Sequence, residues 1–479
     1  MQTIIKKTGR IRKKDSIVCM THSVASIPDT LITDEEKQYV NHHYKKHNTS
    51  QFSFNYIDFW RFVIIIDEKG AAYDILEKCR RAGSEIVDRI NACKLNEVVL
   101  MDTSEDPLKI MALAEGISLG NYQFIKYKTK EKDSLNSLSG IRVYSRHVGD
   151  KLIDEMNILN DAGYKCRDMV NEPLSTLNAG RFAEIMADMS EKAGVKAEIF
   201  NRKKIESLKM GGLLAVNKGS LDPPTFTVME WKPAKHKNKK PLVLTGKGVV
   251  YDTGGMNLKT GNYMNDMKSD MAGGAAVASA IYAAGRMNLP VWVIALVPAT
   301  DNRVDGNAFV SGDVIRMYNG STVEVINTDA EGRMILADAL SYAAKYKPEL
   351  VINLATLTGS ASRATGKYGM VGMHHRAGIQ MNRLERSGRR VYERIAEFPF
   401  WDEYSELLKS DVADIKNIGG ADAGAITAGK FLQHFAEFPF IHLDIAGTAF
   451  VTKKDSYRGK GATASGLRLL IDFIKNYQE

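Results

Sequence analysis

Short apolar runs alternate with longer amphipathic stretches along most of the chain. Near the start, Arg61–Asp67 (RFVIIID) and Asn96–Asp102 (NEVVLMD) have the length and the polar boundaries of buried strands. The stretch between them, AYDILEKCRRAGSEIVDRINAC, has helical periodicity. These patterns predict a smaller α/β domain over residues 1–150.

A polar stretch and a helical segment follow this first domain. The polar stretch is KYKTKEKDSLNSLSG, and the helical pattern runs from about Gly149 to Met169. We interpret the helix as a linker over residues 151–170, followed by a second, larger domain over residues 171–479. Two domains also suit the length, because 479 residues lie far above the usual single-domain size of roughly 100 to 150.

Six further apolar runs predict strands in the second domain, and helical patterns separate them. The runs are AEIFN, FTVMEW, PLVLTG, VWVIALV, ELVINLATL and FIHLDIAG. This alternation is typical of an α/β/α fold in which helices cover a mainly parallel or mixed sheet. Ligands of such sheets bind beyond the carboxyl ends of the strands, so the residues that follow these runs are the candidates for chemistry.

Composition and charge narrow the function classes. Hydrophobic residues make up 44% and charged residues 25%, which is typical of globular proteins and excludes a largely disordered chain. The net charge of +8 permits an acidic partner such as nucleic acid, and a DNA-binding or regulatory role is therefore one alternative. The single dense basic cluster, Lys6–Lys14, has no interleaved aromatic residues, so we interpret it as a solvated face and consider nucleic-acid binding the weaker hypothesis.

The cysteines and the hydropathy pattern indicate the compartment. No CxxC spacing occurs among the four cysteines, which predicts reduced, structural thiols. No apolar run approaches the 18 residues of a membrane span, and no apolar segment follows the charged N-terminus as in a signal peptide. We expect a cytoplasmic protein without a membrane partner. The cysteines are Cys19, Cys79, Cys93 and Cys166.

Two glycine-rich segments carry acidic and basic side chains directly after apolar runs. The first segment, Leu244–Gly274, contains Lys247, Asp252, Lys259 and Asp270. The second segment, Val325–Leu340, contains Asp329, Glu331 and Arg333. Neither has the glycine spacing of a phosphate-binding loop, and the chain has no HExxH zinc motif. The pair His43 and His47 lacks the glutamate of that motif, so we expect both histidines on the surface.

Charge counting indicates what holds these acidic groups together. Four carboxylates gathered without cations would force several of them to protonate, whereas two divalent ions would cancel their charge. Two-metal hydrolase sites hold such ions about 3.5 to 4 Å apart and activate water as a nucleophile. As a ligand, Lys247 must be neutral, at a cost near 4.6 kcal/mol that metal coordination supplies. Lys259 and Arg333, if they are not ligands, stay cationic and stabilise an oxyanion or orient an anion.

Local structure offers a competing interpretation of both segments. TDAE fits a capping box with Thr328 at the N-cap and Glu331 three residues on, opening the helix RMILADALSYAAKY. Likewise, the stretch DMAGGAAVASAIYAAG, which begins at Asp270, predicts a tightly packed helix of small residues. Spacing alone leaves these alternatives open.

Taken together, the motifs resemble those of the leucyl aminopeptidase family, the dinuclear M17 metallopeptidases. The string NTDAEGRMILADAL closely resembles the family's signature, and the match covers roughly residues 165 to 475. Ordered strings carry it, namely RDMVNEP, MGGLLAVNKGS, TGKGVVYDTGG, DMKSDMAGGAAV, SGDVIRMYNGSTVEVINTDAEGR, NLATLTG, GAITAGKFL and HLDIAGTAF. The chain departs from the family at NLKT, where SLKP is usual, which puts Asn257 and Thr260 beside Lys259 and bears on fine specificity.

This resemblance implies roles for individual residues. One zinc ion would be bound by Lys247, Asp252, Asp270 and Glu331. A second, more exchangeable metal would be bound by Asp252, Asp329 and Glu331, and zinc, manganese, cobalt and magnesium all suit such ligands. Lys259 would polarise the scissile carbonyl, and Arg333 would hold a bicarbonate that acts as a general base.

The resemblance further implies a substrate, an architecture and an assembly. A mostly apolar pocket would favour leucine-like first residues of peptides, with a narrower dipeptidase such as a cysteinylglycinase as the alternative enzyme. The N-terminal domain would have a macro-like fold, and the protein would form a homohexamer. The residues that align with the family's substrate pocket are Met267, Asn327, Ala330, Thr356, Leu357, Gly359 and Ala446.

Overall fold

A computed structural model describes residues 2–130 and 134–477. Its backbone contacts divide the chain into two compact units, one of Met1–Tyr164 with Lys453–Gly459 and one of Lys165–Thr452 with Lys460–Glu479. The division lies inside helix α4 (Asp150–Asn171), the helix that the sequence predicts as a linker. The short segment Lys453–Gly459 belongs to the first unit, although its position in the sequence assigns it to the second domain.

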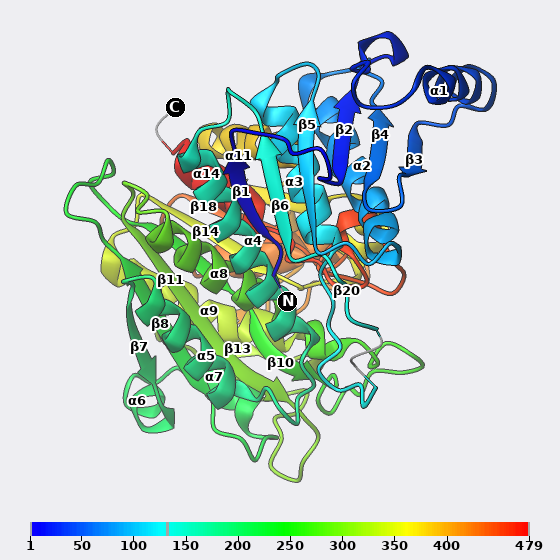
Figure 1. Cartoon of the computed structure of the whole chain (residues 1–479). Helices are drawn as coiled ribbons and strands as arrows, with labels where there is room; N and C mark the ends of the chain where they lie inside the picture. Colours follow the sequence, from blue (N-terminus) through cyan, green and yellow to red (C-terminus); the bar gives the residue numbers. More distant parts are fainter. Residues whose placement is uncertain (1, 131–133, 478–479) are drawn as a thin grey trace. The chain divides into compact units, whose positions relative to one another are not determined.

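The first unit contains a six-stranded sheet in the order β1-β6-β5-β2-β4-β3. Its strand pairs are parallel except the antiparallel pair β3–β4 (Figure 1). Strands β4 and β5 and helix α2 correspond to the three elements that the apolar pattern predicts. The strands are β1 (Ile4–Thr8), β2 (Ile17–Thr21), β3 (Gln51–Asn55), β4 (Trp60–Ile65), β5 (Glu97–Asp102) and β6 (Gly140–Tyr144), and the helices are α1 (Asp34–His47), α2 (Ala72–Ala92) and α3 (Pro107–Gly120).

The second unit is built around a nine-stranded mixed sheet in the order β16-β15-β18-β14-β9-β11-β8-β7, with β10 paired to β11. The inner pairs are parallel, and so is the edge pair β15–β16, whereas the pairs β7–β8, β8–β11 and β15–β18 are antiparallel. All six predicted strands are present. The strands are β7 (Lys196–Phe200), β8 (Thr225–Trp231), β9 (Leu242–Gly246), β10 (Gly248–Asp252), β11 (Val293–Asn302), β14 (Leu350–Ala355), β15 (Met370–His375), β16 (Ile395–Glu397) and β18 (Phe440–Asp444).

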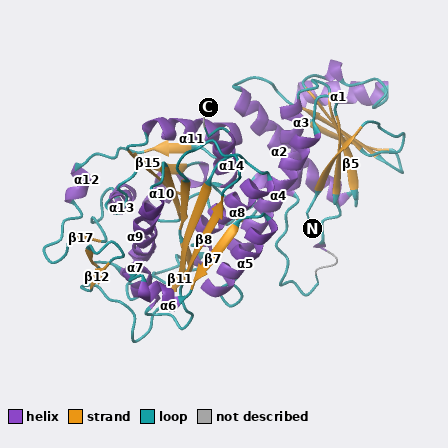
Figure 2. Ribbon diagram, turned by 90° about the vertical axis from the view of Figure 1, so that its left-hand side faces the viewer, coloured by secondary structure: helices purple, strands orange, loops and turns teal. Residues whose placement is uncertain are grey.

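Helices cover both faces of this sheet, as the α/β/α prediction requires. Figure 2 shows α7 and α9 on one face and α5 and α8 on the other. The long helices are α5 (Ala179–Lys192), α8 (Ala272–Arg286), α9 (Glu331–Ala343), α11 (Gly378–Val391), α13 (Gly424–Gln433) and α14 (Leu467–Lys475). Shorter elements are α6 (Arg202–Ser207), α7 (Gly211–Asn217), α10 (Gly359–Thr365), α12 (Glu403–Glu406), β12 (Val314–Arg316), β13 (Thr322–Glu324), β17 (Ile415–Lys416), β19 (Phe450–Val451) and β20 (Gly461–Ala462).

Small residues bring α8 directly onto the centre of the sheet. A Cβ atom at Gly246, the last residue of β9, would lie 2.6 Å from the carbonyl oxygen of Gly273. A Cβ atom at Gly273 would in turn lie 2.2 Å from the carbonyl oxygen of Leu354 in β14. The predicted small-residue helix is confirmed, and its close packing sets Asp270, just before α8, beside the ends of β9 and β14.

A search of the described part of the chain for membrane spans found no helix with the length and apolar character that a bilayer crossing needs.

Candidate metal centre and substrate cavity

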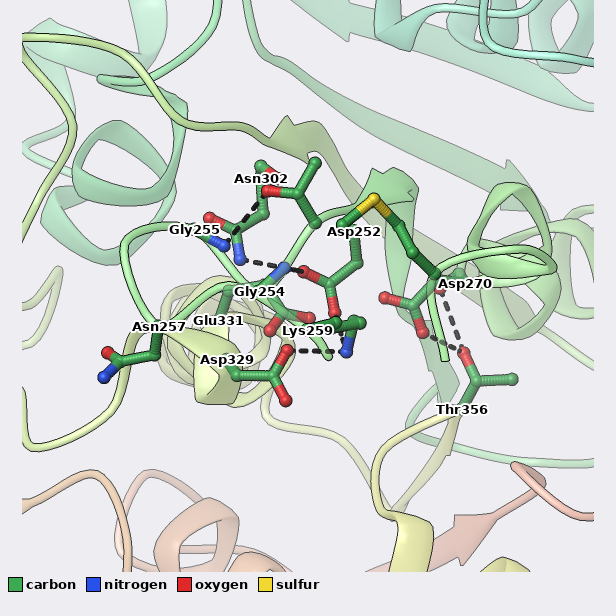
Figure 3. Close-up of polar contacts among 12 residues, drawn as sticks. Asp252, Gly254, Gly255, Asn257, Lys259, Asp270, Asn302, Asp329, Glu331 and Thr356 are labelled. Atoms are coloured by element: carbon green, nitrogen blue, oxygen red, sulfur yellow. Dashed lines mark hydrogen bonds and ion pairs between the residues drawn. The ribbon is translucent and has the colours of Figure 1, made fainter. Parts of the chain in front are cut away.

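The predicted acidic residues meet at the carboxyl ends of the central strands. Asp252 ends β10, and Asp329 and Glu331 lie at the turn that opens α9. One oxygen of each of these three carboxylates lies within 4.8 Å of the others. Asp270, from the turn before α8, completes the group of four (Figure 3). Four carboxylates from three separate segments therefore form one cluster in the second unit.

Two lysines bridge these carboxylates in pairs. The Nζ atom of Lys247, which directly follows β9, lies 2.7 Å from Asp270 Oδ2 and 2.8 Å from Glu331 Oε1. The Nζ atom of Lys259 lies 2.7 Å from Asp252 Oδ2 and 2.5 Å from Asp329 Oδ1. Each lysine thus contacts carboxylates from both glycine-rich segments.

Burial and mutual repulsion shift the protonation of the acidic cluster. Burial, followed by the charge of Glu331, raises the pKa of Asp252 to about 7. Burial also raises the pKa of Asp270 and of Asp329 above the usual range for aspartate. For Glu331 burial acts in the same direction, but Lys247 and Lys259 outweigh it and lower the pKa. Four carboxylates against two lysines therefore leave an excess of negative charge, which the cluster relieves by taking up protons.

Both lysines keep their protons among these carboxylates. Burial lowers the pKa of Lys247, but the charges of Asp270, Glu331 and Asp252 outweigh burial and raise it. The same balance, with Asp252 as the largest charge effect, raises the pKa of Lys259. A role of Lys247 as a metal ligand therefore requires that an incoming cation displace its proton.

The donor set fits divalent cations. Glu331 is 1% exposed, and its Oε2 atom has no hydrogen-bond partner among the described residues. An isolated buried carboxylate oxygen is costly, so an unpaired one aimed into a carboxylate cluster suits a cation. Carboxylate oxygens with one amine nitrogen suit zinc, manganese, cobalt and magnesium.

Arg333 adds a buried cation next to the cluster. It lies in the first turn of α9 and is 6% exposed, and its Nη1 atom donates a hydrogen bond of 2.7 Å to the carbonyl oxygen of Asn417. Burial lowers the pKa of Arg333 to about 10. The guanidinium therefore stays charged at neutral pH, and its Nε atom is buried without a hydrogen-bond partner in the described residues.

The capping-box interpretation of TDAE is wrong. Helix α9 begins at Glu331, and its N-cap, Ala330, has no side-chain cap. The side chain of Thr328 is instead engaged with the other segment, because its Oγ1 atom donates to the carbonyl oxygen of Gly254 over 2.7 Å. The carboxylate of Glu331 contacts Lys247, so its acidic group is committed to the cluster.

Asn257 forms a cross-link between the two glycine-rich segments that sequence reasoning did not identify. Its Oδ1 atom accepts hydrogen bonds from the backbone nitrogen of Thr328 over 2.8 Å and from Ser311 Oγ over 3.2 Å. Its backbone nitrogen donates to Thr328 Oγ1 over 2.8 Å. Lys259 lies two residues after Asn257 and Asp329 one residue after Thr328, so this cross-link positions both.

Further neutral groups orient the carboxylates, and sequence reasoning assigned none of them this role. Asp252 Oδ1 accepts hydrogen bonds of 2.8 Å from Asn302 Nδ2 and from the backbone nitrogen of Gly254. Thr356 Oγ1 donates a hydrogen bond of 2.8 Å to Asp270 Oδ1. Asn302 ends β11 and Thr356 follows β14, so their positions after strands were the available signal (Figure 3).

A cavity of about 690 Å³ opens over the cluster. Apolar side chains, among them Leu258, Ile418, Ala449 and Phe450, contribute to its wall. All seven residues that the sequence resemblance predicts for a substrate pocket lie in its lining. They are Met267, Asn327, Ala330, Thr356, Leu357, Gly359 and Ala446.

Comparison with known proteins decides the family. The profile of the cytosol aminopeptidase family's catalytic domain matches residues 164–471. The chain belongs to this family. It is 41% identical over 431 residues to a probable cytosol aminopeptidase of Chloroherpeton thalassium, covering 84% of each protein. It is 39% identical over 407 residues to one of Geobacter sulfurreducens, covering 83% of this chain and 82% of the relative.

Solved structures support the fold. The bottromycin maturation enzyme BotP, solved in complex with Mn, has 26% identity and a TM-score of 0.86, covering 97% of this chain and 100% of BotP. A mutant of tomato leucine aminopeptidase has 23% identity and a TM-score of 0.86, covering 99% of this chain and 96% of the tomato chain, and supports the two-domain fold alone.

Family membership establishes the type of activity. The protein is a hydrolase, a metal-dependent exopeptidase that acts at the N-terminus of peptides. The resemblance to leucyl aminopeptidases is therefore confirmed. The DNA-binding alternative gains no support from the family or from its relatives.

Proposed function

We propose that the protein is a dinuclear aminopeptidase whose five candidate ligands hold two divalent ions in the carboxylate cluster. One ion is assigned to Lys247, Asp252, Asp270 and Glu331, and the more exchangeable ion to Asp252, Asp329 and Glu331. The observation that carries this proposal is the convergence of these side chains, with a buried and unpaired Glu331 oxygen at their centre. When bound, two such ions supply Lewis acidity and lower the pKa of water toward neutrality.

The identity of the metals follows the ligand chemistry. Zinc is the proposed occupant of the site with Lys247, because zinc accepts a nitrogen ligand together with carboxylates. Zinc, manganese, cobalt or magnesium is proposed for the exchangeable site, whose three assigned ligands are all carboxylates. The related enzyme BotP was solved in complex with Mn, which supports manganese as one candidate.

Lys259 and Arg333 are the proposed catalytic groups outside the ligand set. Lys259 retains its proton, so it can donate a hydrogen bond to the scissile carbonyl oxygen and stabilise the negative charge that develops there. Arg333 stays cationic and presents donors beside the cluster, so it can bind a small anion such as bicarbonate, which would act as a general base.

The cavity wall supports a preference for leucine-like first residues. Apolar groups from Met267, Leu357, Ala446 and the neighbouring Leu258 can bury an aliphatic side chain, which stabilises binding by roughly 25 cal/mol for each Å² of apolar surface. We further propose a cytoplasmic location, in line with relatives that are named cytosol aminopeptidases, and a homohexamer, which the sequence resemblance implies.

Isosteric replacement of two ligands tests the metal assignment. Asp329→Asn and Glu331→Gln each remove one negative charge without a large change in volume, so both should lose metal and at least about 100-fold in kcat/KM on leucyl-p-nitroanilide. Asp411→Asn is the matched control, because Asp411 is exposed and outside the cavity lining. Near-normal turnover in either ligand variant, with the metal content retained, would overturn the proposal.

A substrate panel separates a general aminopeptidase from a narrow dipeptidase. Leucyl dipeptides, leucyl tripeptides and cysteinylglycine should be compared as substrates of the metal-loaded protein. The proposal predicts hydrolysis of leucyl peptides of both lengths, whereas turnover of cysteinylglycine alone would favour the dipeptidase.

A further inference from the structure

The cavity lining contains one charged residue that the proposed chemistry does not use. Seven charged residues line the cavity among those described. Six of them belong to the metal or catalytic set, and the seventh is Arg363. Arg363 is exposed, and none of the ion pairs found among the described residues includes it. A guanidinium without a protein partner in a substrate cavity is available to a charged ligand.

The backbone next to Arg363 leaves room for its guanidinium on the cavity side. Arg363 lies on α10 one helical turn after Gly359, so the two residues share a face of the helix. A Cβ atom at Gly359 would lie 3.2 Å from Nη1 of Arg363. The guanidinium therefore folds back over Gly359, which itself lines the cavity. A side chain at Gly359 would compete for this position.

The position of Gly359 brings Arg363 within reach of a short substrate. Thr356, three residues earlier, donates its hydroxyl to the candidate ligand Asp270. Three residues of chain span at most about 10 Å, which is also the length of an extended tripeptide. A peptide whose first residue lies over the carboxylate cluster can thus extend to Arg363 within the same cavity.

The chemistry of Arg363 selects the group that it can bind. A guanidinium presents planar, paired donors that match a carboxylate, and it keeps its charge at any physiological pH. In a peptide, a carboxylate occurs at the C-terminus and on the side chains of aspartate and glutamate. Both sources offer the same two oxygens.

We propose that Arg363 is a specificity-determining residue that binds a carboxylate of the peptide substrate. This inference rests on the proposed function, because it takes the first residue of the substrate to lie over the metal centre. It deepens that function by naming a substrate class, namely short peptides or acidic peptides whose carboxylate lies within a few residues of the scissile bond.

Matched substrate pairs test the proposal and distinguish the two sources of carboxylate. Leucylglycine and leucylglycinamide differ only in the C-terminal charge. Leucyl-aspartamide and leucyl-asparaginamide, each with an amidated C-terminus, differ only in the side-chain charge. For at least one pair, the metal-loaded wild type should have a higher kcat/KM on the charged member than on the neutral member. Arg363→Gln should reduce the ratio of these two kcat/KM values about fivefold, which is the upper end of the effect of a solvent-exposed ion pair.

Each outcome has a defined meaning. A reduced ratio for the first pair alone assigns the C-terminal carboxylate, and a reduced ratio for the second pair alone assigns the side chain. Ratios within twofold of wild type for both pairs overturn the proposal. Arg363→Glu should reverse the preference, and Arg363→Lys should retain part of it, whereas a purely structural role would change both members of a pair equally.

Two controls separate this inference from the proposed function. Arg389→Gln removes the same charge from an exposed position outside the cavity lining and should leave both ratios unchanged. If the wild type hydrolyses no member of either pair with metal present, the proposed function fails. If it hydrolyses these substrates and only the ratios are insensitive to Arg363, the further inference fails alone.

Discussion

Asn257 offers the sharpest test of how the two glycine-rich segments are held together. The variant Asn257→Ala removes the Oδ1 acceptor and leaves the backbone nitrogen of Thr328, a fully buried residue, without its partner at 2.8 Å. An unpaired buried amide costs about 1 to 3 kcal/mol. Because Asn257 is itself exposed, water can replace part of the lost bond, so we expect a loss near the lower limit, about 1 kcal/mol.

The expected effect on catalysis is larger than the effect on stability. Lys259 lies two residues after Asn257, and Asp329 lies one residue after Thr328. The contact of 2.5 Å between Lys259 Nζ and Asp329 Oδ1 therefore depends on how the hydrogen bonds between Asn257 and Thr328 align the two segments. A displacement of about 1 Å at a catalytic group can cost about 100-fold in rate. Asn257→Ala should therefore reduce kcat/KM on a leucyl substrate about 10- to 100-fold, measured at saturating metal.

Urea unfolding and steady-state kinetics on the same preparation separate these two effects. Asn262→Ala is the matched control, since Asn262 is exposed on the same loop and outside the cavity lining. Asn257→Ser keeps a shorter acceptor and should give an intermediate rate. Activity within twofold of wild type in Asn257→Ala, despite the expected loss of stability, would refute the positioning role.

Three further predictions concern the cluster and the helix that carries it. Metal binding should release protons, because Lys247 and the Asp252 carboxyl, whose pKa is raised to about 7, lose protons on coordination. The apparent metal affinity should therefore rise with pH through about pH 7. Calorimetry in buffers of different ionisation enthalpy measures the proton release. Gly332→Ala should displace Lys247, since its Cβ would lie 2.3 Å from Lys247 Cε, and should reduce metal content, whereas Gly306→Ala, with open space around it, should retain it. Burial raises the pKa of Asp338 to about 7, above its value in the unfolded chain. The contribution of Asp338 to the free energy of unfolding is therefore fully present below about pH 4 and is lost as the pH rises toward 7. Asp338→Asn should flatten this fall in urea titrations, and an unchanged slope would contradict the prediction.

The sequence predicted the parts of the fold that follow from periodicity. Strands β9 and β14 were predicted because each is a short apolar run between polar boundaries, and both lie at the centre of the sheet. Strand β10 was not predicted, because only Lys247 separates its five residues from β9 and because they owe their strand geometry to pairing with β11. The direction of the antiparallel strands near the edges of the sheet also depends on long-range pairing, because apolar periodicity does not encode strand direction.

The candidate site was predictable as far as charge alone determines it. Four carboxylates beside lysines require cations wherever they meet, so their chemistry could be inferred without coordinates. The neutral groups that orient them could not, because the hydrogen bond between Asn257 and Thr328 joins loops that are 71 residues apart. The role of Gly332 is likewise visible only where Lys247 packs against its backbone.

The central claim is that the carboxylate cluster holds the ions on which the activity depends. The most direct measurement is the number of divalent ions per chain, determined by inductively coupled plasma mass spectrometry while metal is titrated into chelator-treated protein and leucyl-p-nitroanilide turnover is followed. The account predicts two ions per chain at full activity, and fewer in Glu331→Gln together with loss of turnover. Full activity in metal-free protein, or a Glu331→Gln variant that binds two ions, would contradict it.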